Sequence, residues 1–376
     1  MLSNTDSRLD GVQWLRAAAA TMIVFLHAEA AVEMQAAAQG LHFRPITGVP
    51  FGSGVDLFFV ISGFIIVFAS ERFFAARGGA REFLKRRICR IVPLYWFALS
   101  LKLALLAAGA AVGAATFPDL TAIITSFAFV PYDAMKFGPR YPFPFLDLGW
   151  TLNYEMLFYA LFASVIWLPR LAASLTAVAV LLTGVLIVWV WQPESVPLWF
   201  WFQPSVLEFA LGIGVALLHR RGVRLSGLSR AGLIGLGLAF WLCVDVTWFD
   251  TAAGPGWYGW TRLFVYGGGA ALILAGVVLG ATKARNPILQ SLSALGDSSY
   301  ALYLLHPFIL MVCRLVLKKL PLSEPMLWPA VVAIVLIAML VAHRFHRSVE
   351  QRVVRALTHY RYHPGLPSEA LGHQRS

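Results

Sequence analysis

Apolar stretches of about 20 residues recur along the whole chain, and they constrain its fold more than any other feature. A transmembrane helix needs roughly 20 mostly apolar residues, because the hydrocarbon core of a bilayer is about 30 Å thick. Ten stretches reach that length and predict an all-α, polytopic membrane helix bundle of about ten transmembrane helices. Their approximate limits are Trp14–Val32, Gly54–Ser70, Ile91–Ala114, Gly149–Leu168, Leu171–Trp191, Phe200–His219, Ala231–Phe249, Arg262–Ala281, Ser298–Leu317 and Leu327–Phe345.

The composition excludes an ordinary water-soluble protein. Of the 376 residues, 59% are hydrophobic and 13% are charged, whereas soluble domains are about 45–50% apolar and about 25% charged. The apolar stretch Thr121–Val130 is too short to cross and is expected to be a partly buried, non-spanning element. We expect one membrane domain over residues 9–349 and a cytoplasmic tail over residues 350–376, with a disordered end.

The basic residues orient the chain, because cytoplasmic segments carry excess Lys and Arg. With an internal N-terminus and ten spans, 22 of the 30 Lys and Arg residues fall on inside segments, 7 on outside segments and Lys102 within a span. Both termini are therefore predicted to be cytoplasmic. The net charge of +11 is assigned to contact with anionic membrane lipids, not to nucleic acid. The three cysteines are far apart and predict neither a disulfide framework nor a metal site.

Ionisable side chains at membrane depth are costly, which makes them functional candidates. Arg16 and His27 are eleven residues apart, or about 16 Å along a helix, with Arg16 at the cytoplasmic mouth and His27 near or beyond the midplane. Histidine takes a proton near neutral pH, so His27 is a candidate general base toward a hydroxyl. A packing hydrogen bond between helices is the alternative interpretation.

Two arginines in the basic segment Glu71–Arg90 form a second candidate. Arg87 and Arg90 are three residues apart and would point to one side of a helix. Guanidinium groups bind phosphate oxygens bidentately, so the pair fits a phosphorylated acyl donor such as acyl-CoA. Contact with lipid headgroups remains the alternative.

Three further places carry polar residues within predicted spans. Asp56 lies among small residues near the outer end of the second span, where it could cap a helix or orient His27. Glu155 lies two turns into the fourth span and needs a partner or a water-filled cavity. His306 precedes Pro307, which favours either a binding role or a helix kink. Beside Glu155, the residues Trp150 and Tyr154 fit an interfacial aromatic belt, and Asn153 could bond a ligand or a neighbouring helix.

Five stretches, in this order, resemble membrane acyltransferase family 3, in particular its exopolysaccharide-production branch. The resemblance covers Leu9 to about Val349, and its motifs are Leu9–Arg16 leading to His27, Gly54–Phe64, Lys85–Tyr95, Gly149–Glu155 and Gly296–His306. It implies about ten spans and O-acylation of surface or secreted carbohydrate.

The resemblance also implies roles for matching residues. The family's Arg and His eleven residues apart fall on Arg16 and His27, with the His essential to acyl transfer. Its Arg pair, associated with the acyl donor, falls on Arg87 and Arg90. The first span has features of a cleavable signal peptide around Ala28–Ala30, but the resemblance implies retention, because cleavage would remove Arg16 and His27.

Together, the residues and the resemblance predict an O-acyltransferase of the bacterial inner membrane that uses acetyl-CoA or another acyl-CoA and no metal. Its acceptor would be an exopolysaccharide, O-antigen or lipid-linked glycan, and its partners membrane lipids and polysaccharide-assembly proteins. A transporter or flippase of lipid-linked sugar, or a non-catalytic scaffold, are the alternatives. The expected catalytic residues are His27, either as general base or as acyl carrier, and Asp56 or Glu155 to orient it; the donor residues are Arg16, Arg87 and Arg90, and the acceptor residues Trp150, Asn153, Tyr154 and His306.

Overall fold

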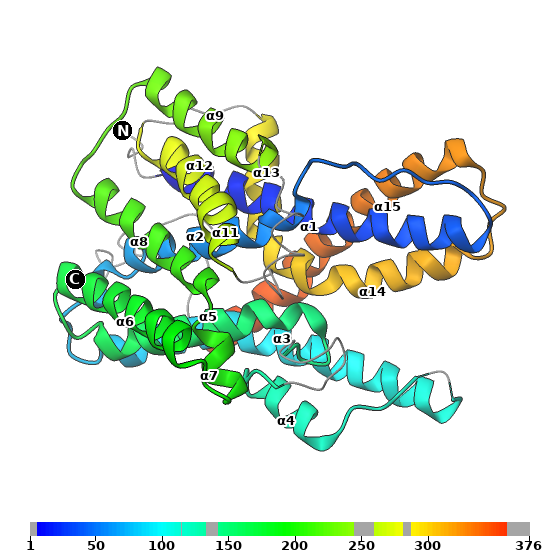
Figure 1. Ribbon diagram of the computed structural model, residues 1–376, viewed down its shortest axis with the longest axis horizontal. Helices are drawn as coiled ribbons and strands as arrows, with labels where there is room; N and C mark the ends of the chain where they lie inside the picture. Colours follow the sequence, from blue (N-terminus) through cyan, green and yellow to red (C-terminus); the bar gives the residue numbers. More distant parts are fainter. Residues whose placement is uncertain (1–5, 114, 133–141, 244–258, 281–286, 359–376) are drawn as a thin grey trace. The chain divides into compact units, whose positions relative to one another are not determined.

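The described residues of the computed structural model, 6–113, 115–132, 142–243, 259–280 and 287–358, form helices and turns with no strand (Figure 1). The all-α prediction is confirmed. The chain divides into two compact units that interleave along the sequence. The first takes the described residues within 1–61, 218–244 and 269–376, and the second those within 62–217 and 245–268.

Seven helical segments among the described residues are long and apolar enough to cross a membrane. These are Asp10–Ala38, Phe51–Phe68, Gly79–Ala111, Arg170–Trp191, Trp260–Val278, Ser299–Leu317 and Glu324–Leu357. The other three predicted spans fall on shorter helices: α5 (Trp150–Val165), α8 (Leu207–Arg220) and α9 (Gly227–Cys243), of 16, 14 and 17 residues. A polytopic membrane bundle is therefore supported by helix length and composition.

The first unit is organised around the long helix α1 (Asp6–Ala38), which packs against α13 (Pro287–Asp297), α14 (Ser299–Leu317) and α15 (Glu324–Phe345) (Figure 1). Glycine permits two of the closest approaches to α1. A Cβ on Gly296 would collide with the Gln13 carbonyl, and one on Gly54, which opens α2 (Gly54–Phe68), would lie 2.5 Å from the Ala19 carbonyl oxygen. Gly54 lies two residues before Asp56, so a small residue of this motif permits the close contact between α2 and α1.

Arg230 has a structural role that its charge alone did not suggest. Its Nε donates to the Gly276 carbonyl at 2.7 Å and its guanidinium also donates to the Val277 carbonyl at 3.3 Å. These carbonyls close α12 (Gly268–Val278), and helix ends leave such groups without intrahelical partners. Arg230, one of the basic residues assigned to cytoplasmic segments, thus caps the C-terminus of α12.

The chain continues helically beyond α15, so the predicted start of the tail at residue 350 lies within a helix. A π-helical turn, His346–Glu350, leads directly into α16 (Gln351–Thr358). The rest of the predicted tail lies outside the described residues.

The second unit is built around α5, which packs against α3 (Gly79–Ala111) and α6 (Arg170–Trp191). Because α3 begins at Gly79, Arg87 and Arg90 lie on a helix, although the sequence placed them in a basic segment before the third predicted span. A Cβ on Gly149 would collide with the Tyr95 hydroxyl, which shows how closely the start of α5 approaches α3. The shorter helices of this unit are α4 (Leu120–Phe127), α7 (Val196–Trp201) and α11 (Trp260–Arg262), which is followed by a π-helical turn at Leu263–Gly267. Its 3-10 turns are Glu71–Phe73, Asp147–Gly149 and Pro204–Val206, and the first unit has another at Phe51–Ser53.

Two sequence expectations in this unit have clear outcomes. Thr121–Val130 was expected not to span, and α4 is indeed one short helix, capped by the Asp119 carboxylate accepting from the Ala122 amide at 2.7 Å. The predicted span Phe200–His219 is interrupted. Its first residues belong to α7, and α8 begins only at Leu207, after the turn at Pro204–Val206.

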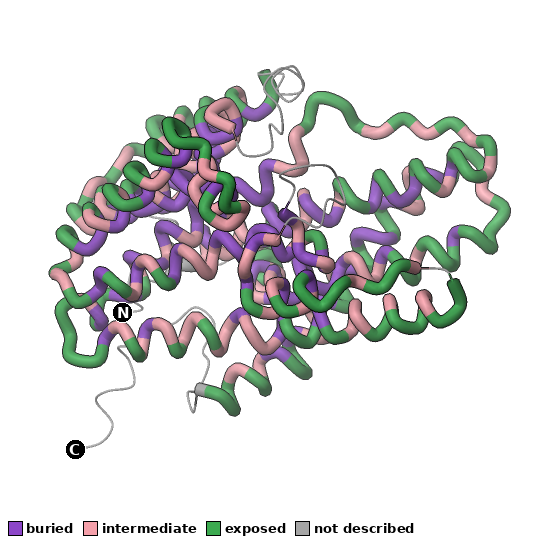
Figure 2. Tube along the Cα trace, turned by 60° about the horizontal axis from the view of Figure 1, so that its bottom comes forward, coloured by how far each residue is buried: buried purple, intermediate pink, exposed green. Residues whose placement is uncertain are grey.

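Large apolar side chains remain exposed along α6, as expected for a helix that faces lipid. Figure 2 shows buried and exposed positions alternating along individual helices. On α6 the exposed apolar residues include Leu175, Leu182, Leu186 and Ile187. Soluble proteins rarely expose a contiguous apolar surface of this kind, and such a surface marks contact with a membrane or with another protein.

Candidate active site

His27 on α1 and His306 on α14 form a pair of neighbouring imidazoles in the first unit. Their ring centroids are 5.0 Å apart and their planes are inclined by 49°. His306 is 1% exposed, whereas His27 is exposed. The packing of α14 on α1 therefore joins two residues that the sequence placed in separate motifs.

Both imidazoles are fixed by carbonyl groups of their own helices. His27 Nδ1 lies 2.7 Å from the Ile23 carbonyl oxygen, and His306 Nδ1 lies 2.7 Å from that of Tyr303. A carbonyl oxygen only accepts, so Nδ1 carries the hydrogen in each bond, which leaves Nε2 as the nitrogen with the lone pair. The pair thus offers two ring nitrogens, each with a lone pair that can accept a hydrogen bond.

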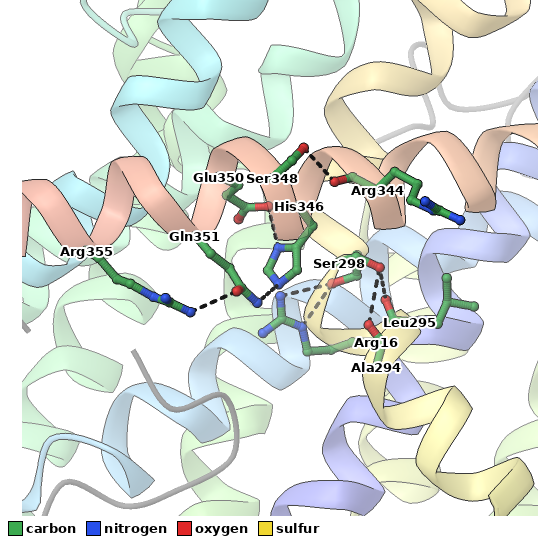
Figure 3. Close-up of polar contacts among 11 residues, drawn as sticks. Arg16, Ala294, Leu295, Ser298, Arg344, His346, Ser348, Glu350, Gln351 and Arg355 are labelled. Atoms are coloured by element: carbon green, nitrogen blue, oxygen red, sulfur yellow. Dashed lines mark hydrogen bonds and ion pairs between the residues drawn. The ribbon is translucent and has the colours of Figure 1, made fainter. Parts of the chain in front are cut away.

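Arg16 lies on the same unbroken helix as His27, so about 16 Å separates them along the axis, and the structure does not bring them together. The Arg16 guanidinium is half-buried, and its Nε and one terminal nitrogen donate to Ser299 Oγ at 3.2 and 3.0 Å (Figure 3). Ser299 opens α14, the helix that carries His306. Arg16 therefore tethers one end of α14 to α1.

A chain of hydrogen bonds runs along the π-helical turn after α15 (Figure 3). Arg355 donates to Gln351 Oε1 at 3.0 Å, the Gln351 amide nitrogen lies 3.0 Å from His346 Nε2, and His346 Nδ1 lies 2.7 Å from a Glu350 carboxylate oxygen. His346 and Glu350 are both buried. The sequence did not predict this network, because these residues follow the last apolar stretch and their helical turn is not visible in the hydropathy pattern.

Asp56 is buried on the first turn of α2. The same turn begins at Gly54, which packs against Ala19 and Ile23 of α1, one turn before His27. Orientation of His27 by Asp56 remains a prediction. The partner that the structure shows on His27 is the Ile23 carbonyl.

The second unit holds a separate polar cluster around Glu155. One Glu155 carboxylate oxygen accepts from the Tyr159 hydroxyl and also from Ser62 Oγ at 3.3 Å. Arg87 lies over the same tyrosine, with its Cζ 5.6 Å from the Tyr159 ring centroid and 5.5 Å from that of Phe83. Glu155 and Arg87, predicted for different roles, thus share one cluster joined by Tyr159.

Tyr159 and Ser62 were missed by sequence analysis. Tyr159 follows Glu155 by four residues, and residues at that spacing are neighbours on a helix, so this signal was available. Ser62 lies on another helix and gave none. Arg90 follows Arg87 on α3, and the two positive charges are close enough to interact, which suits a multiply charged anion.

The remaining acceptor candidates lie at the start of α5. The Tyr154 hydroxyl donates to the Phe200 carbonyl at 2.6 Å and is fully buried, so it holds α5 against α7. The Trp150 ring packs edge-on against Phe143 and Tyr154, inside the unit and not in an exposed belt. Asn153 is 1% exposed, and within the described part of the chain neither of its amide atoms has a hydrogen-bond partner.

The chain is similar to an acyltransferase family and to an exopolysaccharide production protein. The sequence profile of a family described as "Acyltransferase domain" matches residues 9–344. The chain is 33% identical over 282 residues to "Exopolysaccharide production protein ExoZ" of Rhizobium meliloti (strain 1021), across 69% of this chain and 77% of that protein. No solved structure matches the chain.

Proposed function

The chain belongs to the acyltransferase family defined by this domain, and from that premise we propose that it transfers an acyl group from acyl-CoA to a hydroxyl of an exported or cell-envelope carbohydrate at the bacterial inner membrane. That the protein is a membrane acyltransferase follows from the family match and the apolar helices. The carbohydrate acceptor is supported by the name of its relative, which refers to exopolysaccharide production. Acetyl is the proposed acyl group by resemblance.

The observation that carries the proposal is the pair formed by His27 and His306. His27 is exposed and its Nε2 has the lone pair, so it can take the proton of an acceptor hydroxyl. The hydroxyl oxygen then attacks the thioester carbonyl, the carbon–sulfur bond breaks, and the CoA thiolate leaves with the proton that His27 returns. His306 Nε2, 1% exposed beside it, is assigned to accept a hydrogen bond from a second hydroxyl of the sugar, because the reacting hydroxyl gives its one proton to His27.

A two-step version uses the same residues. His27 Nε2 would attack the thioester itself and carry the acyl group until the acceptor hydroxyl displaces it. An acyl group retained on the protein after CoA release, in the absence of acceptor, would identify this route.

The donor is assigned to Arg87 and Arg90 of the second unit. Arg16, in the first unit, stays a donor residue predicted from sequence. Two guanidinium groups on one side of α3 match the phosphate groups of acyl-CoA. Arg87 is held against Tyr159, which fixes the direction of its side chain. Glu155 and Asp56 remain candidates for orienting groups in the reaction, each within its own unit.

The function is tested with purified protein in lipid vesicles supplied with acetyl-CoA and envelope polysaccharide. We expect CoA release coupled to acylation of the glycan. His27→Gln should lower the rate by about 10²–10⁴-fold, the usual contribution of general-base assistance. His42→Gln is the matched control, because His42 is an exposed histidine whose backbone amide, not its ring, bonds Glu324.

Two results would overturn the proposal. Undiminished glycan acylation by His27→Gln would remove the proposed base. Movement of lipid-linked sugar across the vesicle membrane without CoA release would instead indicate the transporter.

A further inference from the structure

Tyr159 lies between the two charged groups of the second unit. Its hydroxyl donates to Glu155, and the Arg87 guanidinium lies over its ring, with Cζ 5.6 Å from the ring centroid. Tyr159 is 3% exposed, while Arg87 and Glu155 are half-buried. The phenol therefore lies, itself buried, between a half-buried cation and a half-buried anion.

The two charges do not pair directly. Among the described residues, Arg87 lies over the rings of Phe83 and Tyr159, and no ion pair joins it to Glu155. A direct bidentate pair would occupy the fork of guanidinium N–H groups that carboxylates and phosphates both match. With the phenol interposed, Glu155 is satisfied by two hydroxyls, from Tyr159 and Ser62.

We propose that Tyr159 is a positioning residue for the acyl donor: its hydroxyl binds Glu155 and keeps the Arg87 guanidinium from pairing with that carboxylate, so that the guanidinium stays directed at a phosphate group of the donor. This inference rests on the proposed function, because it takes acyl-CoA as the donor. It adds to that function a residue that sets donor affinity without touching the donor.

Two features of the cluster make the spacer role specific to the hydroxyl. The stacking of Arg87 on Phe83 and on the Tyr159 ring persists when the hydroxyl is removed, so the guanidinium stays nearby. Glu155 then loses one of its two donors, and an uncompensated carboxylate in a half-buried site attracts the nearest cation. In Tyr159→Phe, Arg87 is therefore expected to turn toward Glu155.

The test measures the dissociation constant of CoA for the full-length protein in lipid nanodiscs, which requires no turnover. Tyr159→Phe should weaken CoA binding by about tenfold or more, the usual effect of losing a hydrogen bond that serves a charged group. Tyr159→Phe combined with Glu155→Gln should restore binding to the level of Glu155→Gln alone, because a neutral amide no longer competes for Arg87. This double-mutant cycle isolates the coupling between Tyr159 and Glu155 in CoA binding.

Ser126→Ala is the control, because it removes a buried hydroxyl of the same unit that donates to the Ala122 carbonyl and has no assigned role in binding. It should lower thermal stability as much as Tyr159→Phe does, with unchanged CoA affinity. Unchanged affinity in Tyr159→Phe, or weakened affinity that Glu155→Gln fails to restore, would overturn the spacer role.

Two further measurements keep the inference testable. If Tyr159→Phe does not fold, Glu155→Gln alone should bind CoA as tightly as the native protein or more tightly, and weaker binding contradicts the inference. If the native protein itself fails to bind CoA, the proposed donor is wrong. If instead the native protein binds CoA and Tyr159→Phe binds it equally well, the donor stands and only the role of Tyr159 is wrong.

Discussion

At the scale of single residues, Asn153 of α5 is a polar side chain buried inside the second unit. Its amide is 1% exposed, and within the described residues both its nitrogen and its oxygen lack hydrogen-bond partners. A buried polar group left unsatisfied costs about 1–3 kcal/mol. Asn153 therefore destabilises the free protein, which favours its assignment to a polar ligand over a packing role.

Asn153→Leu should separate these two interpretations. We expect the apparent unfolding temperature to stay constant or rise, because an apolar side chain of similar size removes the unsatisfied amide. Glycan acylation should fall by about tenfold or more, since a ligand hydrogen bond is lost. The two readouts are thermal unfolding in detergent and CoA release in vesicles.

Ser174→Ala is the control for this comparison. Ser174 is also fully buried in the second unit with no partner for its hydroxyl among the described residues, but it lies on α6. Its replacement should leave acylation unchanged. Parallel loss of stability and activity in Asn153→Leu would show that the amide serves packing.

The residues of the candidate site could be predicted from sequence only where spacing within one helix decides the geometry. Arg87 and Arg90 share a side of α3 as expected, and Arg16 and His27 share α1. The pairing of His27 with His306 depends on how α14 packs on α1, which no local pattern encodes. The contact of the Ser62 hydroxyl with Glu155 could not be predicted either, because it depends on how α2 packs on α5.

At the scale of elements, glycine determines how closely helices approach. Gly63 of α2 lies against the backbone of α8, where a Cβ would collide with the Phe209 carbonyl oxygen. Backbone cannot yield as a flexible side chain does. Gly214, also on α8, has no neighbouring heavy atom within 4 Å of an added Cβ.

These two glycines predict opposite effects of the same substitution. Gly63→Ala should destabilise the protein by about 1–3 kcal/mol, the usual range for overpacking. Gly214→Ala should stabilise it by about 0.5–1 kcal/mol, because alanine restricts the unfolded chain and favours a helix interior. Apparent unfolding temperatures measured at one heating rate give the comparison, and equal shifts in both variants would contradict the close contact between α2 and α8.

Element boundaries were less predictable than element types. Hydropathy alone joined Phe200 to His219, because apolar residues continue across the turn at Pro204–Val206. Proline lacks a backbone N–H and disfavours helix in the residue before it, so Pro204 was the available signal for the break. The start of α3 at Gly79 was missed because charged residues there resemble a loop.

At the scale of the whole molecule, the apolar stretches predicted the class of fold, since their lengths match a bilayer. The division into two interleaved units could not be predicted, because it depends on contacts between helices distant in sequence. The number of crossings separates two topologies. Ten crossings place both termini on the cytoplasmic side, whereas the seven long helices alone would place them on opposite sides.

Reporter fusions distinguish these topologies. We predict ten crossings, so that a fluorescent protein fused after Ser376 is folded and fluorescent in the cytoplasm, and a periplasmic phosphatase inserted after Gln192 is active. The reason is charge: Arg220, Arg221, Arg224 and Arg230 follow α8 and belong inside by the distribution of basic residues. The 16 residues of α5 cover about 24 Å, which a modest local thinning of the bilayer accommodates.

An insertion after Arg77 serves as the internal control, because both topologies place that segment in the cytoplasm. If only seven helices cross, the reporter after Gln192 would be cytoplasmic and the one after Ser376 external. That pattern would place α5, α8 and α9 within the membrane without crossing it. Donor access to Arg87 from the cytoplasm would survive, because α2 and α3 cross in either topology and Arg87 lies near the cytoplasmic start of α3.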